Sequence, residues 1–297
     1  MSSIRKVKRK NLDLEKYTRA LNDSLNYRIY AEVWYLDILT DKKWECLVCG
    51  DYEVIMPIPL QSKFGIRFVL QPIFCQQLGV FYKDEISEEL FSKFEAKLHK
   101  YRVRNYCFNE ENTERFNPKG KKKTNHVLDL NLPYEQLRKN YNRNRRRKLI
   151  PMPDFYVLKL SDTSDDFIRL FKEEYPDLMS DKWADKLQLI MKKAFEQNIG
   201  YQCRVEGDNQ LIAGLFYIKT HRRIFQLGAA RDKNISDIGF FTIIIDYTIN
   251  LFSNSKDYKF DFEGSSVPGV ALFNESFGAE KKYFTYYQSP IFNFLKT

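Results

Sequence analysis

The sequence predicts an α/β protein of the α+β type, made of two tandem domains in which a mixed, mostly antiparallel sheet is flanked by helices. Three observations lead to this fold class. The chain has 297 residues, enough for two domains of ordinary size that each bury a core. One pattern of strands and helices occurs in both halves. A strongly basic segment of different composition separates the two copies.

The repeated pattern centres on two hairpins. CLVCGDYEVIMPIPL, which starts at Cys46, and CRVEGDNQLIAGLFYI, which starts at Cys203, both read as strand, tight Gly-Asp turn and strand. A further strand follows each hairpin and ends in Gln-Leu-Gly, at residues 77–79 and 226–228. Helices precede the hairpins at 14–39 and 165–197, and a helix and a strand follow at 87–101 and 103–108, and at 237–252 and 258–262. This shared order favours tandem duplication; two coincidentally similar units are the alternative.

The segment between the copies sets the predicted domain boundary. Residues 117–125 form a polar loop, HVLDLNL from His126 reads as a strand, and PYEQLRKNYNRNRRRKLI reads as one basic helix that Pro151 and Pro153 terminate. We therefore predict an N-terminal domain at 1–150, which includes the basic linker helix, and a C-terminal domain at 151–297.

The stretch from Tyr258 to Tyr287 has the pattern of an active-site corner. Period-two alternation places Asp261 and Glu263 on one face of a strand, opposite its aromatic residues. Residues 264–266 form a Gly-Ser turn, a short helix begins near Pro268, and a strand returns at 283–287. The predicted apolar stripe and C-cap of that helix are Val270, Phe273, Phe277 and Gly278. The first half shows no such unit.

Four stretches together resemble the GNAT N-acetyltransferase fold: WYLDILTDKKWECLVCGDYEVIMPIPL, KFGIRFVLQPIFCQQLGVF, NYNRNRRRKL and FDFEGSSVPGVALFNESFGAEKKY. A tandem pair of such domains is similar to the FemAB-type peptidyl and aminoacyl transferases and to related uncharacterised bacterial acetyltransferase-like proteins. The resemblance implies two acyl-CoA N-acyltransferase (GNAT-like) domains. It also implies transfer of an acyl group to an amine where the fourth and fifth strands splay apart, and we expect the second domain to hold the site.

The resemblance also identifies candidate cofactor-binding residues. Backbone N–H groups of Leu227, Gly228 and Ala229 would polarise the carbonyl of the acyl donor, which would be acetyl-CoA or another acyl-CoA. In GNAT proteins spaced glycines then cradle the pyrophosphate, but the corresponding stretch here is AARDKNISDIGFF. Arg231, Lys233 and Ser236 are its candidate contacts.

Two departures from the GNAT pattern concern the donor and the catalytic acid. Asp237 would place negative charge where a phosphate should bind, which is unfavourable at a helix N-terminus. FemAB-type proteins also lack a clean glycine loop and take their acyl group from aminoacyl-tRNA. The usual tyrosine acid aligns with Phe273 or Asn274, and Asn274 is kept as a candidate contact of the cofactor.

Asp261 and Glu263 are the candidate catalytic residues. An attacking amine must lose a proton, and a carboxylate at a strand end beside aromatic residues is suited to accept it. The alternatives are a solvated strand face or a side chain that caps the following helix.

The basic cluster is a candidate anion-binding or nucleic-acid-binding site, because guanidinium groups match the geometry of phosphates. It could hold a tRNA acceptor stem, CoA or a nucleotide-linked acceptor, and its alternative is a solvated helix face between the domains. The cluster consists of Arg143, Arg145, Arg146, Arg147 and Lys148.

The sequence thus favours an N-acyltransferase that moves an acyl group from acyl-CoA to a small-molecule or peptide amine. The alternatives are a FemAB-like aminoacyl-tRNA-dependent transferase and a binding protein that retains the fold without the chemistry. The net charge of +9 favours an anionic partner. We expect no metal, because Cys46 and Cys49 lack a second pair at zinc spacing and the three histidines are scattered.

The same sequence features indicate the compartment. The charged N-terminus lacks a secretory h-region, no stretch is long enough to span a bilayer, and five cysteines suit a reducing compartment. We expect a cytoplasmic protein with no membrane partner; the sequence leaves the oligomeric state open.

Overall fold

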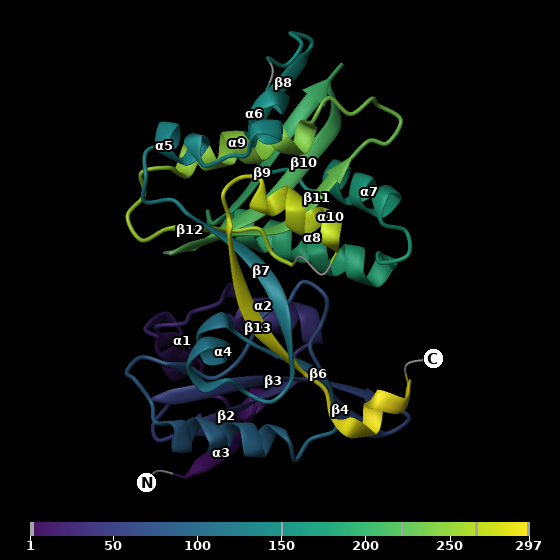
Figure 1. The fold of residues 1–297 in the computed structure, drawn as a ribbon. Helices are drawn as coiled ribbons and strands as arrows, with labels where there is room; N and C mark the ends of the chain where they lie inside the picture. The colour runs from purple at the N-terminus through teal and green to yellow at the C-terminus, as the bar shows by residue number, and fades with distance from the viewer. Residues whose placement is uncertain (1–2, 150, 221, 265–266, 296–297) are drawn as a thin grey trace. The chain divides into compact units, whose positions relative to one another are not determined.

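The computed structural model describes residues 3–149, 151–220, 222–264 and 267–295 (Figure 1). His221 and the predicted turn residues Ser265 and Ser266 lie outside the described residues. The chain divides into two compact units: unit 1 contains Met1–Thr124 and Tyr283–Thr297, and unit 2 contains Asn125–Lys282.

Unit 1 is a sheet with helices packed on it. Its strands are β1 (Ile4–Lys8), β2 (Trp44–Cys49), β3 (Val54–Lys63), β4 (Ile66–Leu70), β5 (Phe81–Tyr82), β6 (Val103–Phe108) and part of β13 (Glu280–Tyr287). Its helices are α1 (Leu14–Asn22), α2 (Val33–Thr40), α3 (Glu88–Leu98), α4 (Glu110–Phe116) and the 3-10 turns η1 (Arg9–Asn11), η2 (Ile29–Ala31) and η3 (Pro290–Leu295).

The strand order of this sheet is β1-β2-β3-β4-β6-β13, and β5 pairs with β3. All of these pairs are antiparallel except β4 with β6, where Val69 lies opposite Val103 and Leu70 opposite Asn105. Helices α1 and α2 pack against β3. The predicted mixed, mostly antiparallel sheet is therefore confirmed in unit 1.

Unit 2 repeats this architecture. Its strands are part of β7 (Lys121–Asp129), β8 (Tyr156–Ser161), β9 (Gly200–Gly207), β10 (Gln210–Lys219), β11 (Arg223–Arg231) and β12 (Lys259–Asp261). Its helices are α5 (Tyr134–Lys139), α6 (Arg143–Lys148), α7 (Asp165–Glu174), α8 (Asp181–Glu196), α9 (Phe240–Phe252) and α10 (Pro268–Glu275). The strand order is β7-β12-β11-β10-β9-β8.

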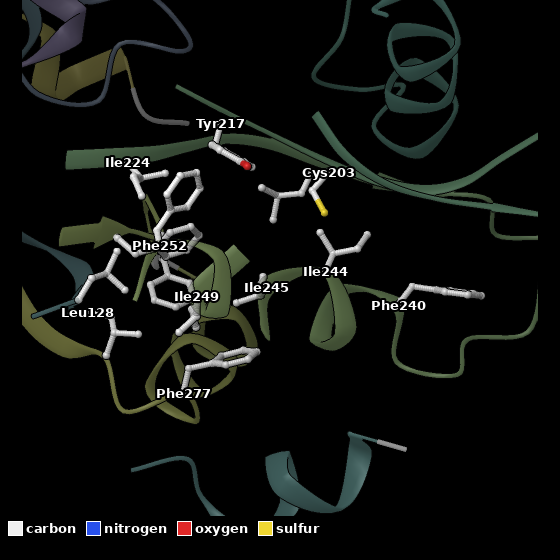
Figure 2. Close-up of a cluster of buried hydrophobic side chains, with 14 of the residues drawn as sticks. Leu128, Cys203, Tyr217, Ile224, Phe240, Ile244, Ile245, Ile249, Phe252 and Phe277 are labelled. Carbon is white, nitrogen blue, oxygen red and sulfur yellow. The ribbon is translucent and has the colours of Figure 1, made fainter. Parts of the chain in front are cut away.

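The core of unit 2 lies between this sheet and α9. Helix α9 is apolar and contributes Ile244, Ile245 and Ile249, which pack against side chains from β9, β10, β11 and β12 (Figure 2). Phe277, just after α10, joins the same cluster. Helix α7 packs on the other face, because Phe167 lies against Gly214, which alternates along β10 with core residues Ala213 and Leu215. Phe167 and Phe171 also lie against Gly228 of β11.

Unit 1 is built from two segments of chain, and unit 2 is the continuous segment between them. The chain passes from unit 1 to unit 2 within β7 and returns within β13. The compact units therefore do not coincide with the predicted domains 1–150 and 151–297. The cause is that β7 pairs with β12 of unit 2, whereas Thr285–Tyr287 of β13 pair with β6 of unit 1. The amino-acid composition reveals the basic linker, but it does not indicate that a strand after unit 2 pairs with a strand of unit 1.

Three details of the sequence analysis were wrong. The basic segment forms two helices, because α5 ends at Lys139 with Asn140 as its C-cap, and Asn142 caps α6 by accepting a hydrogen bond from the Arg145 N–H (2.8 Å). Val270 is exposed and does not belong to a buried stripe, although Phe277 is buried. The first half does contain a strand–helix–strand unit, formed by β6, α4 and β7.

Candidate functional site

Two parallel strands separate in unit 2. Strands β11 and β12 pair only from Arg223 with Lys259 to Phe225 with Asp261, after which β12 ends and β11 continues to Arg231. Adjacent parallel strands that diverge at their carboxyl ends form a common ligand position in α/β folds. This is the place at which the sequence analysis expects the acyl donor and the amine to meet.

A β-bulge lies in β11 beside this separation. Phe216 of β10 lies opposite Gly228 and Tyr217 lies opposite Gln226, which leaves Leu227 as the additional residue. A bulge interrupts the ladder and changes the direction of local backbone groups. The bulged residue lies within the predicted carbonyl-polarising segment at 227–229; that role stays a prediction.

Gly228 is required by packing from the opposite face of the sheet. A Cβ atom at this position would lie 3.1 Å from a ring carbon of Phe171 and 3.5 Å from one of Phe167. The two α7 rings therefore fix the position of the bulged backbone, as expected where a strand glycine allows close approach.

Two polar atoms next to the bulge are buried without a protein partner in the described part of the chain. They are the side-chain oxygen of Gln226 and the hydroxyl of Tyr217, and their residues are opposite each other in the β10–β11 ladder. Burial raises the pKa of the Tyr217 phenol well above its ordinary value, so this group stays neutral. A buried acceptor without a partner marks a position where a ligand N–H can be accommodated.

Asp261, one of the two candidate bases, is fully buried. Its Oδ2 accepts a hydrogen bond from Arg223 (2.9 Å), and its Oδ1 accepts bonds from the side chain of Asn125 (2.8 Å) and the N–H of Glu263 (3.0 Å). Arg223 is itself buried, so the two form a buried ion pair. Such a carboxylate is well placed to fix the backbone around it.

Glu263, the second candidate, has a backbone conformation that is unusual for a residue with a side chain. Its φ angle is +46°, and that of Gly264 is +47°. Left-handed backbone at a non-glycine residue costs on the order of 1–3 kcal/mol and concentrates at functional sites. The side chain is half-buried. Strain and partial exposure make Glu263 the stronger candidate of the two carboxylates.

A histidine–carboxylate pair lies close to the end of β12. His126 is buried on β7, its carbonyl accepts a hydrogen bond from the N–H of Phe262 (3.0 Å), and its Nε2 lies 3.0 Å from Oε1 of Glu275. This hydrogen bond, together with Lys281, lowers the pKa of the Glu275 carboxyl. The sequence analysis treated the histidines as unconnected, because no local spacing links residues 149 positions apart.

The start of α9 is occupied by a carboxylate of the chain itself. Oδ1 of Asp237 accepts hydrogen bonds from the N–H groups of Gly239 (2.8 Å) and Phe240 (3.2 Å). These are the donors that would otherwise face a phosphate at this helix N-terminus. The negative charge that the sequence placed here therefore caps the helix.

Two of the three predicted contacts that precede Asp237 are bonded to α7. The Arg231 N–H donates to Oε2 of Glu174 (2.6 Å), and Lys233 donates to the Glu174 carbonyl (2.8 Å), so both residues are held at the end of α7. Ser236 is exposed. Asn274, the remaining candidate, is buried on α10.

Helix α6 lies beside the start of α9, and the buried side chain of Arg145 connects the two. Its Nε donates to the hydroxyl of Ser276 (2.8 Å) and its Nη1 to that of Thr242 on α9. The guanidinium also stacks on the rings of Phe273 (4.1 Å) and Phe277 (4.7 Å).

Arg145 is a buried cation without a carboxylate partner among the described residues, and burial lowers the pKa of its guanidinium. A buried charge held only by neutral groups is costly. The other cluster members, Arg143, Arg146, Arg147 and Lys148, are exposed. Helix α6 therefore presents a basic surface next to a helix start that is already capped.

The described residues hold neither a metal-binding cluster nor a helix able to span a membrane. These residues contain no group of three or more His, Cys, Asp or Glu side chains able to hold a metal ion. No helix within the same residues is long and apolar enough to cross a membrane. All five cysteines are buried.

Comparisons with known proteins identify the fold. No protein-family model and no curated protein matches the sequence. A crystal structure of FemX is similar with a TM-score of 0.67 and 10% identity, over 99% of this chain and 100% of FemX. A tandem GNAT protein from the clavulanic acid biosynthesis pathway gives 0.54 and 10%, over 96% and 98% of the two chains. L-PGS from Bacillus licheniformis gives 0.53 and 13%, over 94% and 92%.

At these identities the similarity concerns the fold alone. The chain has the tandem GNAT fold of FemX and the tandem GNAT protein, which confirms the predicted fold class over nearly its whole length.

Proposed function

We propose, from the tandem GNAT fold, that the protein is an N-acyltransferase that transfers an aminoacyl group from aminoacyl-tRNA to an amine. The choice of donor rests on one observation at the start of α9. There the carboxylate of Asp237 accepts the hydrogen bonds of the Gly239 and Phe240 N–H groups. A CoA pyrophosphate needs such donors, whereas a tRNA backbone can bind exposed guanidinium groups. Helix α6 presents those groups beside the same helix start.

The reaction is placed at the separation of β11 and β12. The amine nitrogen attacks the ester carbonyl, a C–N bond forms, and the C–O bond to the ribose breaks. Backbone N–H groups at the Leu227 bulge stabilise the negative charge on the carbonyl oxygen. The Glu263 carboxylate takes the amine proton, which passes to the departing ribose oxygen. Asp261 positions Glu263 through the hydrogen bond to its N–H.

The donor assignment is tested by the salt dependence of tRNA binding. Replacing Arg146 and Arg147 by Gln should weaken binding and reduce the slope of log K against log salt by about 1.8, or about 0.9 for each lost phosphate contact. The control replaces Arg102 and Arg104, which are also exposed, by Gln and should keep the slope of the unaltered protein.

The same proteins are examined for thermal stabilisation by aminoacyl-tRNA, acetyl-CoA and a longer acyl-CoA. A ligand at 100 times its Kd adds about 2.7 kcal/mol to folding stability. If acyl-CoA stabilises the protein and aminoacyl-tRNA does not, the acyl donor is acyl-CoA and the proposed tRNA donor is wrong. No response to any donor would favour a binding protein without the chemistry.

The chemical step is tested by Glu263→Gln. Loss of the base should lower turnover by about 10² without weakening tRNA binding. Turnover that stays at the level of the unaltered protein, in a folded variant, would remove Glu263 from the mechanism.

A further inference from the structure

A pocket of about 350 Å³ in unit 1 is lined mainly by cations. It lies where η1, the turn between α2 and β2, and the β3–β4 hairpin meet. Six basic side chains and one carboxylate, Glu45, line it, so its charge is strongly positive. The basic residues are Lys8, Arg9, Lys10, Lys42, Lys43 and Arg67.

The charges in the wall of the pocket are largely compensated. Arg9 forms a two-pronged ion pair with Asp37, with distances of 2.8 and 2.7 Å. Glu45 is buried, accepts a hydrogen bond from the hydroxyl of Tyr101 and lies 3.8 Å from Arg67. Arg9, Glu45 and Arg67 thus form part of the pocket wall, and their charges are neutralised by neighbouring side chains.

Four lysines at the pocket remain uncompensated. Lys8, Lys10, Lys42 and Lys43 are exposed, and no ammonium group of the four has a hydrogen-bond or ion-pair partner within the residues that the structure describes. The two in the α2–β2 turn are brought there by left-handed backbone, with φ of +54° at Asp41 and +58° at Lys42. Non-glycine residues adopt this conformation at a cost of roughly 1–2 kcal/mol each.

The hairpin that forms one side of the pocket ends in an apolar tip. Gln61, Ser62 and Arg67 line the pocket, and Phe64 and Ile66 lie between them in the sequence. The side chain of Phe64 is 90% exposed and that of Ile66 48%. Exposed apolar side chains next to a basic surface are typical of proteins that bind the membrane interface.

We infer that unit 1 binds the surface of an anionic phospholipid bilayer through this pocket and hairpin tip. The four lysines contact headgroup phosphates, and Phe64 and Ile66 insert at the level of the headgroups. The exposed aliphatic side chain of Ile66 favours a bilayer over RNA, because it offers no ring on which a base stacks, whereas the exposed ring of Phe64 suits either partner and the ring of Trp44 is buried. The inference is independent of the proposed donor site, and it proposes a membrane partner where the sequence features predict none.

The test is vesicle binding by the full chain, measured by co-sedimentation. Vesicles of phosphatidylcholine with 30% phosphatidylglycerol should bind the protein, and vesicles of phosphatidylcholine alone should not. Each basic residue near an anionic surface strengthens binding about fivefold, so replacing Lys42 and Lys43 by Gln should lower partitioning about 25-fold. Phe64→Ser should lower it about tenfold.

A matched control separates this site from net charge. Lys192 and Lys193 are an adjacent, exposed pair on α8 of unit 2, and their replacement by Gln removes the same charge. The control should lower partitioning less than threefold, and all variants should keep the melting temperature of the unaltered protein because the altered side chains are exposed.

Equal losses in the lysine variant and its control would overturn the inference. So would equal binding to neutral and anionic vesicles, or unchanged binding by Phe64→Ser. If the lysine variant loses affinity for RNA but binds vesicles normally, the pocket is a nucleic-acid site and the inference is wrong. Failure of tRNA-dependent transfer would leave these measurements unaffected.

Discussion

The two units end their parallel strand pairs differently. In unit 1 the space beyond the β4–β6 pair is closed by the chain itself. Gln71 donates to the carbonyl of Cys75 (2.7 Å) and accepts a hydrogen bond from the N–H of Cys107 (2.7 Å). Further along, the Leu78 N–H donates to the carbonyl of Cys107, and the Asn109 N–H donates to that of Leu78, both at 2.8 Å. Residues 71–78 are thus bonded to β6.

In unit 2 the corresponding separation stays open toward β11. Phe262, just after β12, donates to the carbonyl of His126 on the opposite side. For the described residues, no backbone hydrogen bond joins Gln226, Leu227 or Gly228 to the segment that follows β12. One topology is therefore closed by backbone hydrogen bonds in unit 1 and lacks such bonds in the described part of unit 2, which supports placing the proposed chemistry in the second unit.

The largest effect should come from the buried ion pair that ends the β11–β12 pairing. We expect Asp261→Ala to destabilise the protein by about 3–5 kcal/mol, because it leaves the buried Arg223 charge without its partner. Urea unfolding measures this. The double variant Arg223→Met, Asp261→Leu should lose less than the single variant; an equal or greater loss would show that the charges are not what couples these strands.

Glycine substitution compares the closed and open ends directly. Gly79 has a φ of +130°, and a Cβ there would lie 2.2 Å from Oδ1 of Asn112, whereas the nearest atom to a Cβ at Gly228 is 3.1 Å away. Gly79→Ala should therefore cost roughly 2–3 kcal/mol and Gly228→Ala less than about 1.5 kcal/mol. Thermal unfolding of both variants checks the order. A reversed order would mean that the unit 2 bulge is the more tightly packed of the two.

The helices after the parallel pairs differ in capping. Asn109 caps α4 by accepting a hydrogen bond from the Asn112 N–H (2.9 Å), whereas Val267 precedes α10 and offers no side-chain cap. Asn109→Ala should lower the free energy of unfolding by about 1–2 kcal/mol, and Val267→Ser should raise it by at most about 1 kcal/mol. Chemical denaturation of the two variants measures both changes. A loss of stability in Val267→Ser would show that the start of α10 depends on the apolar side chain.

The smallest effect concerns acid stability near α10. His126 and Lys281 lower the pKa of Glu275 in the folded state below its unfolded value of about 4.3. The resulting stabilisation is present above that pH and is lost as the pH falls through the folded pKa. Glu275 is 36% exposed, so solvent screening limits the effect to within about 1 kcal/mol. The free energies of unfolding of Glu275→Gln and of the unaltered protein should differ at pH 6, and the difference should shrink as the pH is lowered toward 3. A difference that does not change with pH would contradict the ion pair.

Local patterns predicted most of the elements but few of the contacts. Alternation and the Gly-Asp turns located both hairpins, and Pro268 and Gly278 delimited the region of α10, with Gly278 in the predicted left-handed conformation. The partners of Asp261 are 38 and 136 residues away, and no spacing rule indicates them. A solvated strand face was therefore one of the expected alternatives for Asp261. In the structure Asp261 is buried and forms an ion pair with Arg223.

The basic segment shows the same limit. Its charge and its position before a proline were evident from sequence, yet Arg145 differs from its neighbours because α9 and the residues after α10 surround it. Similarly, Asp237 was recognised as unfavourable for a phosphate, and the structure supplies the reason, namely two hydrogen bonds to the start of α9. Tertiary contacts, which one sequence does not reveal, separate the buried member from the exposed ones.

The exchange of strands between the units has a consequence for biosynthesis. Unit 1 needs β13, whose pairing residues begin at Thr285, so its sheet cannot be completed until the ribosome has also made the whole of unit 2. At 5–20 residues per second the first 124 residues wait on the order of ten seconds for that strand. During this interval β6 has an exposed edge, a position prone to wrong pairing. A nascent chain of this protein therefore completes the sheet of unit 1 only after unit 2 has been synthesised.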